Sequence, residues 1–155
     1  MIKMICFDMD GTIADLYGVS GWLDMLESGD VYPYTIAKPM YDMCELVQVL
    51  TKLLANGIDI RIITWLAKDA TPQYKNETRK AKIEWLNKYN FPCSKIHAVQ
   101  YGTTKANCVR AELGKGETAI LIDDNIKVRN GWTLGDTIDP NENLIEMLKE
   151  LLKNE

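Results

Sequence analysis

Several residue patterns that mark particular classes of protein are missing from this sequence. Its four cysteines include no C-x-x-C pair, and one of them, Cys6, lies inside an apolar run. Scattered cysteines of this kind indicate buried, reduced thiols in a cytoplasmic protein. No uninterrupted apolar stretch approaches the length of about 18 residues that marks a membrane span. The chain also begins without a charged and then apolar leader, so we expect neither a membrane span nor a secretory signal.

A strong excess of charge of either sign is also missing. The net charge is only -4 in 155 residues, of which 46% are hydrophobic and 26% charged. This composition is typical of an ordinary soluble globule and gives no general electrostatic bias toward nucleic acid or membranes. The chain is long enough to bury one full core, and it has no internal repeat or low-complexity linker. We therefore expect a single domain over residues 1–155.

Strand-like and helix-like segments take turns along the chain. Short apolar or β-branched runs predict strands at 1–7, 58–64, 95–99, 118–122 and near 132–138. Apolar residues at helical spacing predict helices at 19–28, 41–57, 71–89, 103–113 and 141–153. The alternation predicts an α/β fold with a Rossmann-like parallel sheet and helices on both faces. Residues 15–40 interrupt it, and we expect them to form a small flap or mini-cap insertion after the first strand.

Polar side chains stand where three of the predicted strands finish. The run "ICF" ends at Asp8, "RII" ends at Thr64, and "AILI" ends at the pair Asp123 and Asp124. The carboxyl ends of parallel strands share one edge of the sheet, where ligands bind. These residues are therefore predicted to meet in space although they are far apart in the sequence.

The convergent acids suggest a metal site. Asp8 and Asp10 point roughly to one side of an extended chain, and Asp123 and Asp124 arrive from another strand. Up to four carboxylates would repel one another unless a cation were present. All-oxygen ligation with room for water and phosphate oxygens suits Mg²⁺. Gly11 and Thr12 follow directly, "DGT", and supply a sharp turn, a hydroxyl and an amide beside the site.

Each of these features also has a plain structural interpretation. A D-x-D-G string in isolation is most often a turn, Lys105 alone would be an exposed helix lysine, and Asp123-Asp124 could begin a loop. The only histidine, His97, lies in a short apolar run and is expected to be structural. The predicted helix at 71–89 carries five basic residues interleaved with Glu77 and Glu84, which indicates a solvated face: Lys75, Arg79, Lys80, Lys82 and Lys88.

Taken together, four motifs resemble the haloacid dehalogenase superfamily of phosphotransferases. They are "DMDGT" after the first strand, "IIT" at the end of the second, Lys105 within "GTTKANCV", and "LIDD". Their order and spacing cover nearly the whole chain. Any one of these motifs is weak evidence, whereas all four in register on an α/β pattern are a strong signal.

The resemblance implies a role for each matching position. Asp8 would be the nucleophile that forms an aspartyl-phosphate, and Asp10 would be the general acid and base. Thr64 and Lys105 would hold the phosphoryl oxygens, with Gly11 and Thr12 close by. Mg²⁺ would be held by Asp8, by the backbone carbonyl of Asp10 and by a motif-four acid, with Asp124 favoured as the direct ligand and Asp123 as its partner.

The substrate is predicted from the insertion after the first strand. The flap is too small to be a large cap, and we expect Trp22, Tyr32, Tyr34 and Trp65 to give the site an aromatic edge. A small phosphorylated substrate such as a nucleoside monophosphate would fit, with its base stacked on a ring. The chain is similar in look to the small 5′(3′)-deoxyribonucleotidase-type branch of the superfamily.

Two alternatives stay open at this point. The first is a 3′-phosphatase that acts on nucleic-acid ends, supported by the basic helix at 75–88. The second is a nucleotide- or phosphate-binding protein without useful turnover, serving as a sensor or sequestering protein.

Overall fold

A five-stranded parallel sheet forms the centre of the computed structural model, which describes residues 1–154. The strand order is β5-β4-β1-β6-β7, and every neighbouring pair is parallel. The strands are β1 (Ile2–Phe7), β4 (Asp59–Trp65), β5 (Lys95–Val99), β6 (Thr118–Ile122) and β7 (Thr137–Ile138). The α-helices are α1 (Trp22–Glu27), α2 (Tyr32–Ile36), α3 (Met43–Ala55), α4 (Pro72–Lys88), α5 (Ile126–Asn130) and α6 (Leu144–Asn154). This arrangement confirms the predicted α/β fold, which is Rossmann-like.

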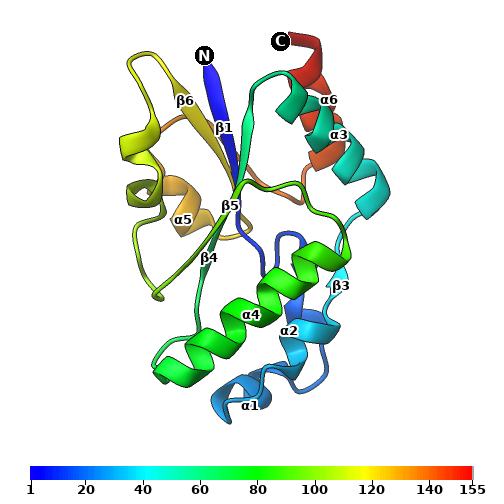
Figure 1. Cartoon of the computed structure of the whole chain (residues 1–155), viewed down its shortest axis with the longest axis vertical. Helices are drawn as coiled ribbons and strands as arrows, with labels where there is room; N and C mark the ends of the chain where they lie inside the picture. The colour runs from blue at the N-terminus through cyan, green and yellow to red at the C-terminus, as the bar shows by residue number, and fades with distance from the viewer. Residues whose placement is uncertain (155) are drawn as a thin grey trace.

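Both faces of the sheet are covered, as expected for parallel strands made of nearly continuous apolar runs. Alternate side chains of the central strands, such as Phe7 and Ile62, pack in one core with α3, α4 and α6. The intervening side chains, such as Cys6 and Leu121, pack in a second core with Val109 and with Trp132. Figure 1 shows α3 and α6 on one side of the sheet and α5 on the other.

The two longest helices begin where local sequence signals place them. The Asp42 side chain accepts a hydrogen bond from the Glu45 amide at 3.1 Å and caps α3. The Thr71 side chain accepts a hydrogen bond from the Tyr74 amide, also at 3.1 Å, and caps α4, whose first turn contains Pro72. These are the cap residues and the proline position that helix N-termini favour.

Two predicted elements are wrong in kind or length. The helix expected over 103–113 is replaced by two 3-10 turns, η2 (Lys105–Cys108) and η3 (Arg110–Glu112). Its buried apolar side chains, Ala106 and Val109, are three residues apart, which suits a 3-10 turn as well as an α-helix. The strand expected near 132–138 is only two residues long. Helices α2 and α5 were not predicted from the sequence.

Residues 15–40 form a small lobe beside the carboxyl ends of the strands. A two-stranded antiparallel ribbon, β2 (Ala14–Asp15) with β3 (Lys38–Pro39), closes the base of this segment. Between the two strands lie η1 (Leu16–Gly18), α1 and α2. The helix expected from residue 19 begins only at Trp22, because Gly21 is in the left-handed region with φ of +74°. Figure 1 shows α1 and α2 next to α4 at the end of the molecule opposite both termini.

Within residues 1–154, no helix is both long and apolar enough to cross a membrane.

The first core, which contains Phe7 and Ile62, offers a direct test of the packing. Leu50 of α3 is completely buried among the residues of the first core. The change Leu50→Ala should lower the free energy of unfolding by about 2–5 kcal/mol, because it removes buried methyl groups and leaves a cavity. Urea unfolding of both proteins measures the loss. Gln48→Ala, an exposed change on the same helix, should alter it by less than about 0.5 kcal/mol; equal effects would contradict the packing.

Candidate active site

The site lies where the order of the strands reverses. The chain runs outward from β1 to β4 and β5, and then returns to the other side of β1 as β6. Asp8 follows β1 directly, and Asp123 and Asp124 follow β6. Crevices for ligands form outside the carboxyl ends of strands at such a reversal. The predicted meeting of these three acids is therefore confirmed.

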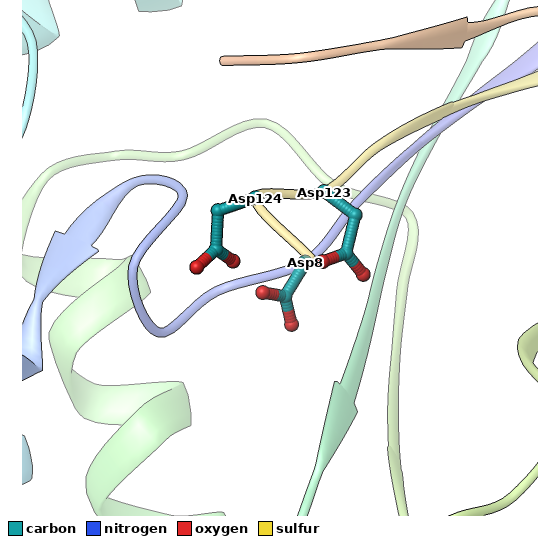
Figure 2. A group of neighbouring side chains, drawn as sticks. All are labelled: Asp8, Asp123 and Asp124. Atoms are coloured by element: carbon teal, nitrogen blue, oxygen red, sulfur yellow. The ribbon is translucent and has the colours of Figure 1, made fainter. Parts of the chain in front are cut away.

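Three carboxylates come together at this point. Asp8, Asp123 and Asp124 each offer an oxygen, and these oxygens all lie within 4.8 Å of one another. Figure 2 shows the three side chains gathered where the ribbons of β1 and β6 lead into their loops. The Asp8 amide donates to the Ile122 carbonyl at 2.8 Å, so the two strand ends are tied together beneath the cluster.

The turn after Asp8 supports this cluster from one side. The Thr12 hydroxyl is 3.1 Å from Asp8 Oδ2 and 3.1 Å from Asp124 Oδ1, and it accepts from the Asp124 amide at 3.2 Å. Gly11 has φ of +80°, and a Cβ there would lie 2.6 Å from Asp124 Oδ2. Glycine is needed both for the turn and for the close approach of Asp124. The positions predicted beside the site, Gly11 and Thr12, are therefore part of it.

A buried ammonium group links two of the acids. Lys105 Nζ is 2.9 Å from Asp8 Oδ1 and 2.8 Å from Asp123 Oδ2, and the lysine is 5% exposed. Burial opposes its charge, but the attraction of Asp8 and Asp123 outweighs burial and raises the pKa of Lys105. From the sequence alone, Lys105 could equally be interpreted as an exposed lysine on a helix. In the structure Lys105 is instead a fixed cation at the cluster.

A second buried ammonium group was not predicted. Lys82 of α4 is fully buried, and its Nζ is 3.0 Å from Asp10 Oδ2 and 2.7 Å from Thr64 Oγ1. The expectation that Lys82 belongs to a solvated basic face is therefore wrong. Lys82 lies one helical turn from the buried residues Thr78 and Trp85, so this spacing was the signal that could have found it.

The side chain of Asp10 is not part of the three-acid cluster. Its carboxylate pairs with Lys82, and Asp10 is not one of the residues whose oxygens converge with Asp8. Burial raises the pKa of Asp10, and the charge of Asp8 adds to the rise, although Lys82 opposes it. The protonated form of Asp10 is thus favoured relative to that of an ordinary aspartic acid.

The motif-four acids are also shifted toward their protonated forms. Burial and then the charge of Asp8 raise the pKa of Asp123. Burial and contact with Asp8 raise the pKa of Asp124 to about 7. Burial is the largest cause of both shifts, and the proximity of Asp8 adds to it. Four carboxylates face two ammonium groups here, a deficit that a divalent cation would remove.

The donor set fits Mg²⁺. The converging ligand atoms are all carboxylate oxygens, which a hard cation prefers, and the adjoining cavity leaves room for water and phosphate oxygens. Both Asp123 oxygens already accept hydrogen bonds, from Lys105 and from the Asn125 amide at 2.9 Å. Within residues 1–154, the Asp124 carboxylate accepts a hydrogen bond from only one protein group, the Thr12 hydroxyl. Of the two acids that follow β6, Asp124 is therefore better placed than Asp123 to be a direct ligand, as favoured from the sequence.

A cavity of about 860 Å³ opens beside the acids and runs under the 15–40 segment. Asp8, Asp10, Thr64 and Lys105 line one end of it. Its remaining wall includes aromatic side chains from several elements: Tyr17, Trp22, Tyr34, Trp65, Tyr74 and Tyr101. The volume is within the range of small-molecule sites.

The aromatic edge was predicted in part. Trp22, Tyr34 and Trp65 line the cavity as expected, but Tyr32 does not and is 52% exposed. Tyr32 and Tyr34 lie on α2, where residues two apart point about 200° away from each other, so only one can face the cavity. Tyr17, Tyr74 and Tyr101 also line the cavity and were not predicted to do so. Tyr17 and Tyr101 lie in short turns, which carry too few residues for a periodic pattern.

His97 lies away from the acids, on β5. It is buried, and its ring contacts Arg61 Nη1 at 3.1 Å. Arg61 also makes a two-pronged ion pair with Glu112, at 2.6 and 2.8 Å. The histidine therefore belongs to a polar network that ties η3 to the sheet, and the structural role expected for it is confirmed.

Comparisons with models of known protein families and with curated proteins give no match for this sequence.

The raised pKa values predict a pH-dependent stability. The pKa of Asp124 is about 7 in the folded protein and near 3.8 when unfolded, so the folded state binds more protons between these values. Without metal, this group's contribution to stability is full below about pH 4 and is lost as the pH rises through about 7. Asp124→Asn should therefore become progressively more stabilising relative to the parent protein from pH 5 to pH 8.

Urea unfolding in the presence of a chelator, at several pH values, measures this difference. Asp136→Asn, a change to an exposed acid outside the cluster, serves as the control and should show no such trend. A constant difference between Asp124→Asn and the parent across this pH range would contradict the raised pKa.

Proposed function

We propose that this protein is a Mg²⁺-dependent phosphomonoester hydrolase of the haloacid dehalogenase type, acting through an aspartyl-phosphate on Asp8. The observation that carries the proposal is the combined geometry at the sheet edge. Asp8 lies among two further carboxylates and a buried lysine, with Asp10 and Thr64 held beside it by a second lysine. Phosphoryl transfer depends mostly on positioning and charge neutralisation, which this set of groups supplies.

In the first half of the reaction, an Asp8 carboxylate oxygen attacks phosphorus. The bond from phosphorus to the leaving oxygen breaks, and that oxygen takes its proton from Asp10. Lys105 and Thr64 stabilise the charge that develops on the phosphoryl oxygens. A bound Mg²⁺, held by Asp8 and Asp124 with Asp123 behind them, would neutralise charge on the phosphoryl group and on Asp8.

In the second half, Asp10 takes a proton from water, and the water oxygen attacks phosphorus. The bond between phosphorus and Asp8 breaks, which releases inorganic phosphate and restores the Asp8 carboxylate. Asp10 thus acts first as an acid and then as a base, a pair of tasks that suits a carboxyl group with a raised pKa.

We favour a nucleoside monophosphate as the substrate class. The cavity is far larger than a phosphate group, and aromatic side chains such as Trp22 and Trp65 line its wall. An aromatic base can stack on such rings. Action on nucleic-acid ends is less well supported, because Lys82, one of the basic residues on which that alternative rests, is buried.

The test is phosphate release with Mg²⁺ from ribo- and deoxyribonucleoside monophosphates, sugar phosphates and a 3′-phosphorylated oligonucleotide. The parent protein should act on the nucleoside monophosphates. Asp8→Asn should lower kcat by at least about 10³-fold, since it removes the nucleophile. Asp136→Asn should retain full activity. Release from the oligonucleotide alone would support the nucleic-acid alternative.

Ligand binding distinguishes the proposed phosphatase from a nucleotide-binding protein without turnover. Asp8→Asn should still bind the nucleotide, measured by calorimetry. If the parent binds a nucleotide and releases no phosphate from any substrate, the phosphatase proposal is wrong and a binding protein is supported.

Metal binding has a readout that does not involve activity. Excess Mg²⁺ should raise the melting temperature of the parent protein relative to a chelator, because a ligand that binds only the folded state stabilises it. A hundredfold excess over Kd gives about 2.7 kcal/mol. Asp124→Asn should lose most of this stabilisation, whereas Asp136→Asn should keep it. Equal stabilisation of all three proteins would show that the cluster is not the metal site.

A further inference from the structure

Lys82 is unusual among the ionisable residues because it is completely buried. Lysine is almost never fully buried unless its charge is paired. Its side chain extends from α4 to the end of β4 and to the turn that carries Asp10. The ammonium also lies 5.2 Å from the centre of the Tyr34 ring, so it touches the 15–40 segment as well. Elements from three parts of the chain meet at this one charge.

The ammonium has no donor left for a substrate. Its three N–H groups match three acceptors: Asp10 Oδ2 at 3.0 Å, Thr64 Oγ1 at 2.7 Å and the Trp65 carbonyl at 3.1 Å. Asp10 and Thr64 line the cavity, and Lys82 lies behind them. Lys82 therefore acts on a substrate only through these two residues.

Two of these contacts orient groups that face the cavity, Asp10 and Thr64. With Oδ2 of Asp10 bonded to Lys82, the other oxygen, Oδ1, is the one available to a leaving group. Because the Thr64 hydroxyl accepts from Lys82, its own proton is free to be donated elsewhere. A protonated carboxyl group held in one orientation donates its proton more effectively than one that must be ordered during the reaction.

We infer that Lys82 is a positioning residue that orients Asp10 for proton transfer to the leaving oxygen; this rests on the proposed phosphatase function. As the bond from phosphorus to the leaving oxygen breaks, its electron pair stays on that oxygen, which takes the proton from Asp10. Substrates whose leaving groups are stable anions need little of this help. Loss of Lys82 should therefore harm poor leaving groups selectively.

The experiment compares two substrates with Mg²⁺: a nucleoside 5′-monophosphate, whose leaving group is an alkoxide, and p-nitrophenyl phosphate, whose leaving group is a stable phenolate. The quantity compared is kcat/KM, which reports formation of the aspartyl-phosphate and excludes its later hydrolysis, a step common to both substrates. Lys82→Met should lower kcat/KM for the nucleotide by about 10²-fold or more, the range of general acid catalysis. It should lower kcat/KM for the aryl phosphate by less than about 10-fold. Lys80→Met, an exposed change on the same helix, should change neither.

Two outcomes overturn the inference while the phosphatase proposal stands: equal losses for both substrates, which indicate a merely structural role, and no loss for either. Failure of the function itself is distinct, because the parent protein would then release no phosphate from either substrate. That result overturns the role of Lys82 as well.

A second pair of variants keeps the test decisive if Lys82→Met does not fold, which circular dichroism reveals. Lys82→Gln retains a hydrogen-bond donor, and Asp10→Asn removes the acid. Asp10→Asn should show the same selective loss of kcat/KM for the nucleotide. The double variant, Lys82→Gln with Asp10→Asn, should lose no more kcat/KM than Asp10→Asn alone. Independent, additive losses would show that Lys82 does not act through Asp10.

Discussion

Like-charge repulsion at one edge of the sheet is the constraint on which the site depends. Four carboxylates, those of Asp8, Asp10, Asp123 and Asp124, are held close together and partly shielded from water. Two buried ammonium groups, Lys82 and Lys105, divide them into two sets, because Lys105 bridges Asp8 to Asp123 and Lys82 holds Asp10. The pairing is incomplete, and burial together with the nearby charge of Asp8 raises the pKa values of Asp10, Asp123 and Asp124. An arrangement of this kind is costly for a structural purpose alone and is well suited to binding a cation together with a phosphoryl group.

The rest of the fold serves to hold this edge in place. The parallel sheet brings β1 and β6 side by side, so that residues more than a hundred positions apart touch without any specific signal between them. Helix α4 spans the sheet and the 15–40 segment, and it carries Lys82 to Asp10. The Arg61–Glu112 ion pair fastens the end of the 105–112 segment to β4. Because Lys105 lies in that segment, an ion pair whose residues do not line the cavity helps to fix the cation that does.

Much of this could be predicted from the sequence, for physical reasons that also explain the misses. Buried strands and long helices have strong periodic patterns, so the sheet, α3 and α4 were found, and the ends of parallel strands placed Asp8, Thr64, Asp123 and Asp124 together. Short elements carry few residues of pattern, which is why α5, α2 and the turns of 105–112 were missed or misassigned. Lys82 was misjudged because charge is normally a sign of exposure. Only the partners that three other segments bring to it explain its burial. Tyr32 was misplaced because its direction depends on whether residues 32–36 are helical.

The covalent intermediate is the central claim, and acid quenching tests it most directly. The protein, turning over a nucleoside monophosphate with Mg²⁺, is stopped in acid, digested and analysed by mass spectrometry. We expect a phosphorylated peptide that contains Asp8, and we expect this peptide to be missing when the same experiment uses Asp8→Asn. With p-nitrophenyl phosphate, whose leaving group needs little help from Asp10, Asp10→Asn should slow breakdown of the intermediate more than its formation and so increase the amount trapped. Release of phosphate with no phosphorylated Asp8, or with phosphate on another residue, would contradict the account.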